Sequence, residues 1–338
     1  MRRSLIPALA LLASACGGGD GSYSGASAPA SGDVADEPAF ETDQAALDAG
    51  LLCTDFTHPD KPPVLLVHGT FTYGEEQYDW SYLPLLAGRG FDVCTVTYPD
   101  RGLGDQQISA EYVVNALRRI HAQTGRKVAM IGHSQGAGMP RWALKWWKSA
   151  RDAVDDFVLE AGPSHGTSVA ASSLPTGEPA GFWQFAPSSN FVAAVNRDDE
   201  TPGDVSYTSL YSGFYDELVA PVTPVPTAAL DFGMDNPQVA NVLLQDVCAN
   251  RFVDHVMIGT TDRLAFELAV DAITHDGPAN VERAGGATLC GLLPFLPEEL
   301  VGPYTVAGML AVLRTEQANG FPALHLTTEE PPLKPYAQ

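Results

Sequence analysis

The segment Val128-Ala129-Met130-Ile131-Gly132-His133-Ser134-Gln135-Gly136 carries the clearest structural signal in the chain. An apolar run of strand length stops at Gly132, and helix-forming residues follow Gly136. A Gly-x-Ser-x-Gly pentapeptide between a strand and a helix is typical of a tight, strained turn that exposes a serine hydroxyl. The two glycines lack a Cβ, so neighbouring chain can pass close to the turn. The pattern therefore predicts that Ser134 is a nucleophile.

Short apolar strands alternate with helical patterns on both sides of this turn. The run 64–67 is continuously apolar, as expected of a strand buried on both faces of a parallel sheet. Further strands are predicted at 92–98, 157–159 and 205–211, helices at 80–86, 112–120, 135–149 and 264–273, and mainly loop at 168–203. This alternation predicts one doubly wound α/β domain, with a mostly parallel central sheet and helices on both faces.

A serine in such a turn needs a histidine base and a carboxylate that orients the histidine. In this architecture the chain order is serine, then acid, then histidine. Asp216 lies in a turn after a strand, and His255 follows it just before a predicted helix. We expect the backbone N–H of Gln135, with the N–H and hydroxyl of Thr70, to form the oxyanion hole.

Other residues could fill these roles. His165 also follows a strand end and is the strongest rival base, while Glu217 and Glu160 are alternative acids. His68 precedes the nucleophile and is expected to pack behind the loop that carries Thr70, which we call the oxyanion loop. His133 lies inside the turn and is expected to point away from the reacting atoms.

Composition excludes several classes of partner. Of the 338 residues, 45% are hydrophobic, enough for a large core, and the formal net charge is −22. Such a negative charge argues against nucleic acid or an anionic membrane surface as a partner. No metal-ligand spacing or internal repeat is present, so we expect no metal and no cofactor.

The N-terminal residues have the layout of an export signal. A basic start and a short apolar stretch precede Cys16, so residues 1–16 are predicted to be a signal peptide. Cys16 also stands where a bacterial lipobox would place a lipidated cysteine. Its lipidation would leave an even number of cysteines for disulfides in an oxidising compartment. We expect a disordered tether at 17–39 and the folded domain at 40–338.

Several blocks of the sequence together resemble the lipase family of Candida antarctica lipase B and its bacterial relatives, from about residue 46 to the end. These blocks are Leu65-Leu66-Val67-His68-Gly69-Thr70, Glu111-Tyr112-Val113-Val114-Asn115-Ala116, Ser134-Gln135-Gly136, Leu210-Tyr211-Ser212 with Asp216-Glu217, Phe252-Val253-Asp254-His255, and the late segment from Glu330-Pro331-Pro332-Leu333 to Pro335-Tyr336-Ala337.

The resemblance implies an α/β-hydrolase fold. It also matches Ser134, Asp216 and His255 to a catalytic triad, and Thr70 and Gln135 to the oxyanion hole. It further pairs Cys53 with Cys94 and Cys248 with Cys290, which would pin the loop that carries His255.

The sequence departs from this family at two points. His133 stands where the family has a tryptophan that closes a pocket on the alcohol side, so the resemblance predicts a roomier substrate pocket. The chain also stops at Gln338, without the family's final disulfide. The family's mobile entrance segments would correspond to 168–190 and 292–313, which we interpret either as an acyl-binding mouth or as plain core.

Together these features predict a secreted or lipid-anchored serine hydrolase of carboxylic esters, a lipase or esterase. An acyltransferase or polyester depolymerase with the same triad is an alternative, and a non-catalytic lipid-binding surface protein is a third. We expect a monomer that acts on an ester or lipid and that is anchored to a membrane, if at all, through Cys16.

Overall fold

The computed structural model describes residues 34–171, 177–290 and 325–338. Its main feature is a seven-stranded sheet in the order β1-β3-β2-β4-β5-β7-β8, parallel except where β1 pairs with β3 at one edge. The strands are β1 Leu51–Cys53, β2 Val64–Val67, β3 Val93–Val96, β4 Val128–His133, β5 Val154–Glu160, β7 Ser206–Tyr211 and β8 Val239–Leu243. A separate antiparallel pair joins β6 Glu178–Pro179 to β9 Leu326–Thr327. The predicted α/β class with a mostly parallel sheet is confirmed.

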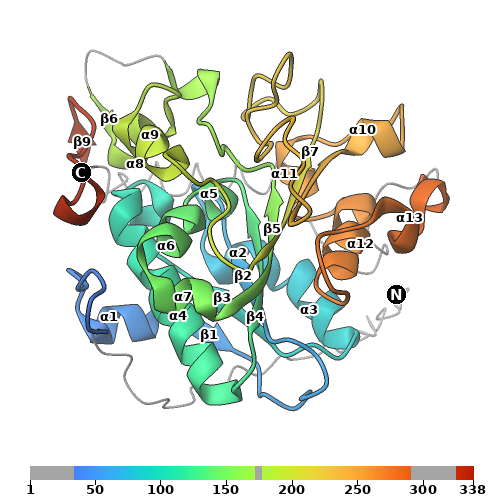
Figure 1. The fold of residues 1–338 in the computed structure, drawn as a ribbon, viewed down its shortest axis with the longest axis horizontal. Helices are drawn as coiled ribbons and strands as arrows, with labels where there is room; N and C mark the ends of the chain where they lie inside the picture. Colours follow the sequence, from blue (N-terminus) through green and yellow to red (C-terminus); the bar gives the residue numbers. More distant parts are fainter. Residues whose placement is uncertain (1–33, 172–176, 291–324) are drawn as a thin grey trace, which may run out of the picture.

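Helices cover both faces of the sheet (Figure 1), with α4 and α6 on one side and α3 and α12 on the other. The helices are α1 Gln44–Ala49, α2 Gly74–Tyr78, α3 Tyr82–Gly88, α4 Gln106–Thr124, α5 Gln135–Gly138, α6 Pro140–Trp146, α7 Lys148–Asp152, α8 Ala180–Phe185, α9 Asn190–Asn196, α10 Leu244–Val247, α11 His255–Ile258, α12 Arg263–Ala272 and α13 Val281–Ala284. Short 3₁₀ turns lie at Pro99–Gly102, Ser168–Ala171, Gly286–Leu289 and Pro335–Ala337.

Burial on both faces explains why strand β2 is apolar at every position. In β2, Leu65 and Val67 belong to the core cluster under α1, α4 and α6. Val64 and Leu66 belong to the opposite cluster, under α3 and α12. Successive strand side chains point to opposite faces, so a strand covered on both sides favours apolar residues at every position.

Two sequence predictions about elements were wrong, and one strand was missed. The single helix expected at 135–149 is divided into α5, α6 and α7, with Pro140 as the first residue of α6, where a proline is tolerated. The segment 168–203 contains α8 and α9, which are too short to show a periodic pattern. Strand β8 was not predicted, because it lies at the sheet edge and is only partly buried.

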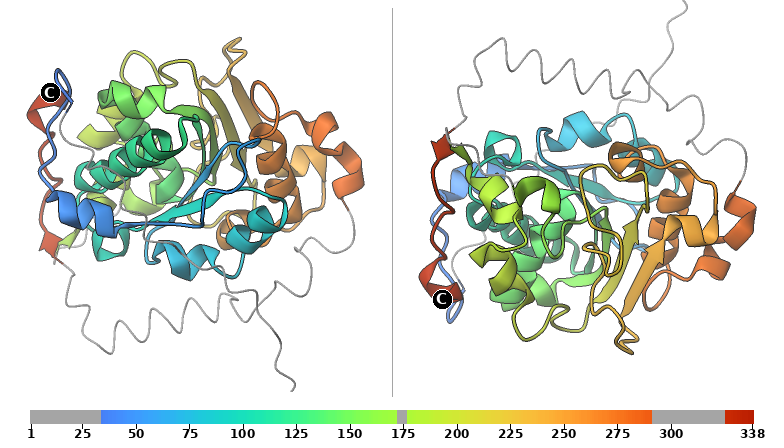
Figure 2. Two further views of the ribbon diagram at one scale, coloured as in Figure 1. Left: turned by 90° about the horizontal axis from the view of Figure 1, so that it is seen from below. Right: turned by 90° about the horizontal axis from the view of Figure 1, so that it is seen from above.

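The folded domain begins earlier than the tether prediction of 17–39 allowed. The Glu37 carboxylate pairs with Arg118 of α4 at 2.6 Å and accepts a hydrogen bond from the Ser149 hydroxyl at 2.7 Å. These contacts depend on one carboxylate that joins α4 to α7, so the local sequence composition does not indicate them. At the other end, residues 325–338 run beside the N-terminal part of the domain (Figure 2), where Lys334 pairs with Glu41 at 2.7 Å.

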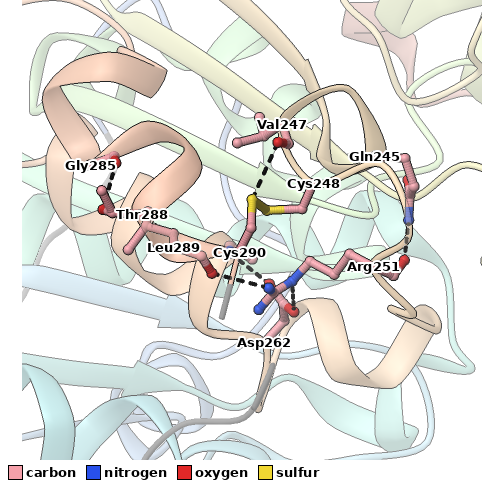
Figure 3. The surroundings of a disulfide bond; sticks show 10 residues. Gln245, Val247, Cys248, Arg251, Asp262, Gly285, Thr288, Leu289 and Cys290 are labelled. Atoms are coloured by element: carbon pink, nitrogen blue, oxygen red, sulfur yellow. Dashed lines mark hydrogen bonds and ion pairs between the residues drawn. A yellow bond between two sulfur atoms is a disulfide. The ribbon is translucent and has the colours of Figure 1, made fainter. Parts of the chain in front are cut away.

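Both disulfides implied by the family resemblance are present. Cys53–Cys94 joins β1 to β3, and Cys248–Cys290 joins the end of α10 to the turn after α13. Beside the second bridge, the buried guanidinium of Arg251 pairs with Asp262 at 2.6 Å (Figure 3). The disulfide and this ion pair together hold the loop that contains His255.

Candidate active site

Ser134 lies in the tight turn between β4 and α5. Its backbone has φ 57° and ψ −120°, a region that non-glycine residues rarely adopt, and its N–H donates to the carbonyl of Glu160 at 2.9 Å. The neighbouring glycines are needed for space. A Cβ on Gly132 would lie 1.8 Å from the Gly136 oxygen, and a Cβ on Gly136 would lie 2.1 Å from the Val67 oxygen. The turn therefore exists only because these positions carry no side chain.

The structure brings the three predicted triad side chains into one hydrogen-bonded line. His255 Nε2 lies 2.8 Å from Ser134 Oγ, and His255 Nδ1 lies 3.1 Å from one Asp216 oxygen and 3.3 Å from the other. Ser134 precedes α5 and His255 begins α11, at the same end of the sheet (Figure 1). This is the arrangement that lets an imidazole take a proton from a serine hydroxyl while a carboxylate fixes its orientation.

The Asp216 carboxylate is held in its ionised form. Burial alone would raise its pKa, but hydrogen bonding to His255 and to the N–H groups of Val219 and Leu218 outweighs burial and lowers the pKa. Those N–H groups lie 2.8 and 3.0 Å from Asp216 Oδ1. The acid thus stays an acceptor for His255 Nδ1–H.

Two neighbouring carboxylates hold the backbone at and just after His255. Glu217 accepts the His255 N–H at 3.3 Å, and Asp254 caps α11 by accepting the Met257 N–H at 2.8 Å. Glu217, the adjacent rival acid, therefore contacts the main chain of the histidine and not its ring. Sequence reasoning missed the cap, although an aspartate just before a short helix is a recognisable signal.

The two predicted oxyanion residues lie side by side. Thr70 Oγ1 donates to Gln135 Oε1 at 3.0 Å, and Gln135 is fully buried. Gln135 packs against Gly102, which has φ 74° and whose Cβ would lie 2.0 Å from Gln135 Oε1. Gly102 was not among the predicted site residues, because its contact with Gln135 depends on tertiary packing.

The rival residues have other partners. His165 bonds to Glu200 at 2.9 Å and to the Thr227 carbonyl at 3.2 Å. Glu160 accepts a hydrogen bond from the hydroxyl of Tyr82 at 2.7 Å. His68 is buried behind the oxyanion loop as expected, stacked 3.9 Å from the Tyr98 ring, and burial lowers its pKa to about 4.

His133 lines the cavity described below, yet both of its ring nitrogens are engaged. Nδ1 lies 3.1 Å from Gln77 Nε2, and Nε2 lies 2.7 Å from the carbonyl oxygen of His255. A Cβ on Gly259 would lie 2.2 Å from the His133 ring, so only glycine fits beside it. Gln77 and Gly259 are further residues of this site that sequence reasoning did not identify.

A cavity of about 180 Å³ opens beside Ser134 and His255. Its walls are mainly apolar side chains, among them Phe71, Trp80, Val169, Phe182, Phe185 and Leu218. The first expected entrance segment, 168–190, thus contributes to the cavity wall. The second, 292–313, lies outside the described residues.

The described ranges contain no cluster of three or more His, Cys, Asp or Glu side chains suited to a metal ion. Within the same ranges, none of the helices combines the length and the hydrophobicity needed to cross a bilayer.

The sheet, the serine turn and the histidine and aspartate beyond it define a class of protein, and the chain belongs to the α/β hydrolase family, whose family model matches residues 64–301. Within that class it is similar to lipase B of Pseudozyma antarctica, an organism also called Candida antarctica. The identity is 30% over 309 residues, which cover 89% of this chain and 87% of that protein. The resemblance predicted from the sequence is confirmed.

Solved structures agree with this assignment. The crystal structure of Aspergillus fumigatus lipase B matches with a TM-score of 0.78 and 28% identity, over 90% of this chain and 74% of that one. The Bacillus licheniformis lipase BlEst2 in its propeptide form matches with a TM-score of 0.52 and 21% identity, over 68% and 54% of the two chains. The second match supports the fold alone.

Proposed function

We propose that this protein is a serine carboxylic-ester hydrolase, a lipase or esterase, that works through an acyl-enzyme. The observation that carries the proposal is the 2.8 Å and 3.1 Å hydrogen-bonded line from Ser134 through His255 to Asp216, at the edge of an apolar cavity. Its similarity to two proteins named lipase B supports the choice of an ester as substrate.

The reaction begins when Ser134 Oγ attacks the ester carbonyl and His255 Nε2 takes the hydroxyl proton. Asp216 stabilises the imidazolium that forms, and the carbonyl oxygen becomes an oxyanion. The N–H groups of Gln135 and Thr70 donate hydrogen bonds to that oxyanion, and the Thr70 hydroxyl joins them when it turns away from Gln135 Oε1. His255 then returns the proton to the leaving alkoxide, which departs as the alcohol and leaves the acyl group on Ser134.

Water completes the cycle. His255 accepts a proton from a water molecule as its oxygen attacks the acyl-enzyme, and the same oxyanion donors stabilise the second tetrahedral intermediate. The intermediate collapses as His255 returns the proton to Ser134 Oγ, and the carboxylic acid is released. The apolar walls around Phe71, Phe182 and Phe185 favour a hydrophobic acyl group over a charged one.

Covalent labelling tests the nucleophile. A fluorophosphonate should label the wild-type protein at one site, which peptide mass spectrometry should place on Ser134, and Ser134→Ala should not react. Labelling elsewhere, or a fully active Ser134→Ala variant, would overturn the proposal. A chain-length series of p-nitrophenyl esters, compared with an emulsified triglyceride, then separates a lipase from a short-chain esterase.

A further inference from the structure

A continuous path of hydrogen bonds links the oxyanion loop to the backbone of the catalytic histidine through residues that take no part in the proposed chemistry. The Gly69 N–H donates to Gln77 Oε1 at 2.9 Å. Gln77 Nε2 lies 3.1 Å from His133 Nδ1, and His133 Nε2 lies 2.7 Å from the carbonyl oxygen of His255. We call this path, Gly69–Gln77–His133–His255, the His133 bridge.

The hydrogen-bonding groups at the two ends of the bridge determine which atoms within it carry hydrogens. A backbone N–H can only donate, so the Gln77 atom facing Gly69 must be the amide oxygen, and the Gln77 NH₂ must face His133. A backbone carbonyl can only accept, so His133 Nε2 must carry a hydrogen. His133 Nδ1 then has to accept, which makes the ring neutral with its single proton on Nε2.

Burial supports the same state of His133. The residue is 6% exposed, and burial, with the nearby His255 as a second cause, lowers the pKa of its imidazole to about 3. The hydrogen bond to the His255 carbonyl and the charge of Asp216 raise that pKa but do not compensate. The ring therefore stays neutral at pH values well above 3.

The structure assigns His133 a positioning role: its Nε2–H holds the main chain of His255, while Gln77 ties the same ring to the oxyanion loop next to Thr70. This assignment rests on the proposed serine hydrolase function. The His255 N–H is held by Glu217 and its carbonyl by His133, so both sides of the residue are fixed. The imidazole and the oxyanion donors thereby keep one mutual spacing.

Such spacing matters for the rate because a displacement of about 1 Å in a catalytic group can cost on the order of 100-fold. Loss of the bridge removes no triad residue but lets His255 move relative to Thr70. The cost should appear in kcat, since the apolar cavity that binds substrate is otherwise retained.

Two amide substitutions at residue 133 distinguish the roles of the two ring nitrogens. In His133→Gln the side-chain NH₂ lies near the former Nε2 and still reaches the His255 carbonyl. In His133→Asn the shorter amide lies near the former Nδ1 and does not reach it. His133→Phe keeps the ring and removes both hydrogen bonds.

We expect His133→Phe and His133→Asn to lower kcat roughly 10- to 100-fold with KM nearly unchanged, and His133→Gln to recover most of that loss. His165→Phe is the matched control, because it also removes two hydrogen bonds of a histidine. It should lower Tm and leave kcat unchanged. Equal kcat in the Gln and Asn variants, or wild-type kcat in the Phe variant, would overturn the assignment.

A spectroscopic measurement tests the bridge independently of activity. In ¹⁵N-histidine-labelled Ser134→Ala protein, the His133 signal, assigned by its loss in His133→Phe, should show a neutral Nε2–H tautomer from pH 5 to 9. A different tautomer, or titration within that range, would overturn the bridge even if the enzyme is active. Absence of fluorophosphonate labelling in the wild type would instead count against the proposed function.

Discussion

At the scale of single residues, the geometry of the site depends on positions that have no side chain as much as on those with proposed chemical roles. Gly132 and Gly136 let the serine turn form, Gly102 makes room for Gln135, and Gly259 makes room for His133. Only the first two belong to a recognisable motif. The other two have nearest neighbours that are remote in sequence, so their requirement for glycine is invisible without the fold.

We predict that Gly102→Ala lowers activity while Gly125→Ala does not. Both glycines have positive φ, 74° and 66°, so an alanine at either costs about 1–2 kcal/mol of stability. The new Cβ at 102 would meet Gln135 Oε1 at 2.0 Å, whereas at 125 it meets nothing within 4 Å. Ester kinetics and thermal unfolding of both variants test this. Equal activities would show that displacement of Gln135 does not matter.

His133→Trp tests the expected substrate preference. The backbone around Gly259 leaves no space on one side of the ring, so a larger indole has to extend into the cavity. We expect the rate with esters of bulky secondary alcohols to fall more than the rate with small alcohols. The measurement is the ratio of kcat/KM for the two ester classes, and that ratio also corrects for the lost bridge. An unchanged ratio would contradict a roomier pocket at residue 133.

At the scale of elements, three of the residues with proposed catalytic roles follow the carboxyl ends of parallel strands. Thr70 follows β2, Ser134 follows β4 and Asp216 follows β7, and these strands lie close together in the sheet order. Parallel strands end at the same edge, so loops far apart in sequence meet there. His255 is the exception, because it lies in a long loop that the Cys248–Cys290 disulfide closes.

Removing each disulfide separately should show which one affects stability alone and which one also affects activity. The bridges close loops of similar length, with sequence separations of 41 and 42, so each should contribute about 4 kcal/mol in the loop-entropy model. Only the Cys248–Cys290 loop contains His255. The Cys53–Cys94 loop contains Thr70, but Thr70 directly follows the central strand β2 and is held there by the sheet. Cys248→Ser/Cys290→Ser should therefore lose stability and kcat, and Cys53→Ser/Cys94→Ser mainly stability. Urea unfolding and ester kinetics test this, and equal losses of kcat would contradict it.

Glu200 gives the fold an acid-sensitive connection between three loops. Its carboxylate accepts hydrogen bonds from His165 and from the Asp231 N–H, both at 2.9 Å. Burial would raise its pKa, but these hydrogen bonds and the charges of His165 and Arg141 lower it to about 2. A lowered pKa means that this stabilisation is complete above the ordinary value of 4.5 and is lost as pH falls towards 2.

We therefore expect Glu200→Gln to lower Tm at pH 7 and to approach the wild type between pH 4.5 and pH 2. Thermal unfolding across that range is the measurement. The exposed Asp198, changed to Asn, is the control and should have a small effect at every pH. A constant difference between Glu200→Gln and wild type would contradict the prediction.

At the scale of the whole molecule, the domain is an α/β sheet with both faces covered and with its site at one edge, in a chain of net charge −22. Such a charge disfavours adsorption to anionic surfaces. We propose that any membrane attachment comes instead from residues before the domain. Four cysteines are consumed in disulfides, which leaves Cys16 as the remaining one.

Lipidation of Cys16, which lies outside the described residues, has a direct test. In a bacterial host fed radioactive palmitate, the wild-type protein should carry the label and Cys16→Ala should not. Fractionation should find the wild type with the membranes and the variant free of them. No label on the wild type, or equal label on both, would rule out the lipid anchor and leave residues 1–16 as an ordinary cleaved signal.

The amino-acid order alone was enough to predict the α/β class, the serine turn and the identities of Ser134, Asp216 and His255 as candidates. Those features are determined by patterns visible along the sequence: an apolar run, two glycines around a serine, and a fixed chain order. The helices within 168–203, the edge strand β8 and the contacts of Glu37 needed the folded chain. So did the His133 bridge, whose hydrogen bonds join residues 8, 56 and 122 positions apart. Local periodicity and turn chemistry act over a few residues, whereas such contacts exist only after the sheet has brought distant segments together.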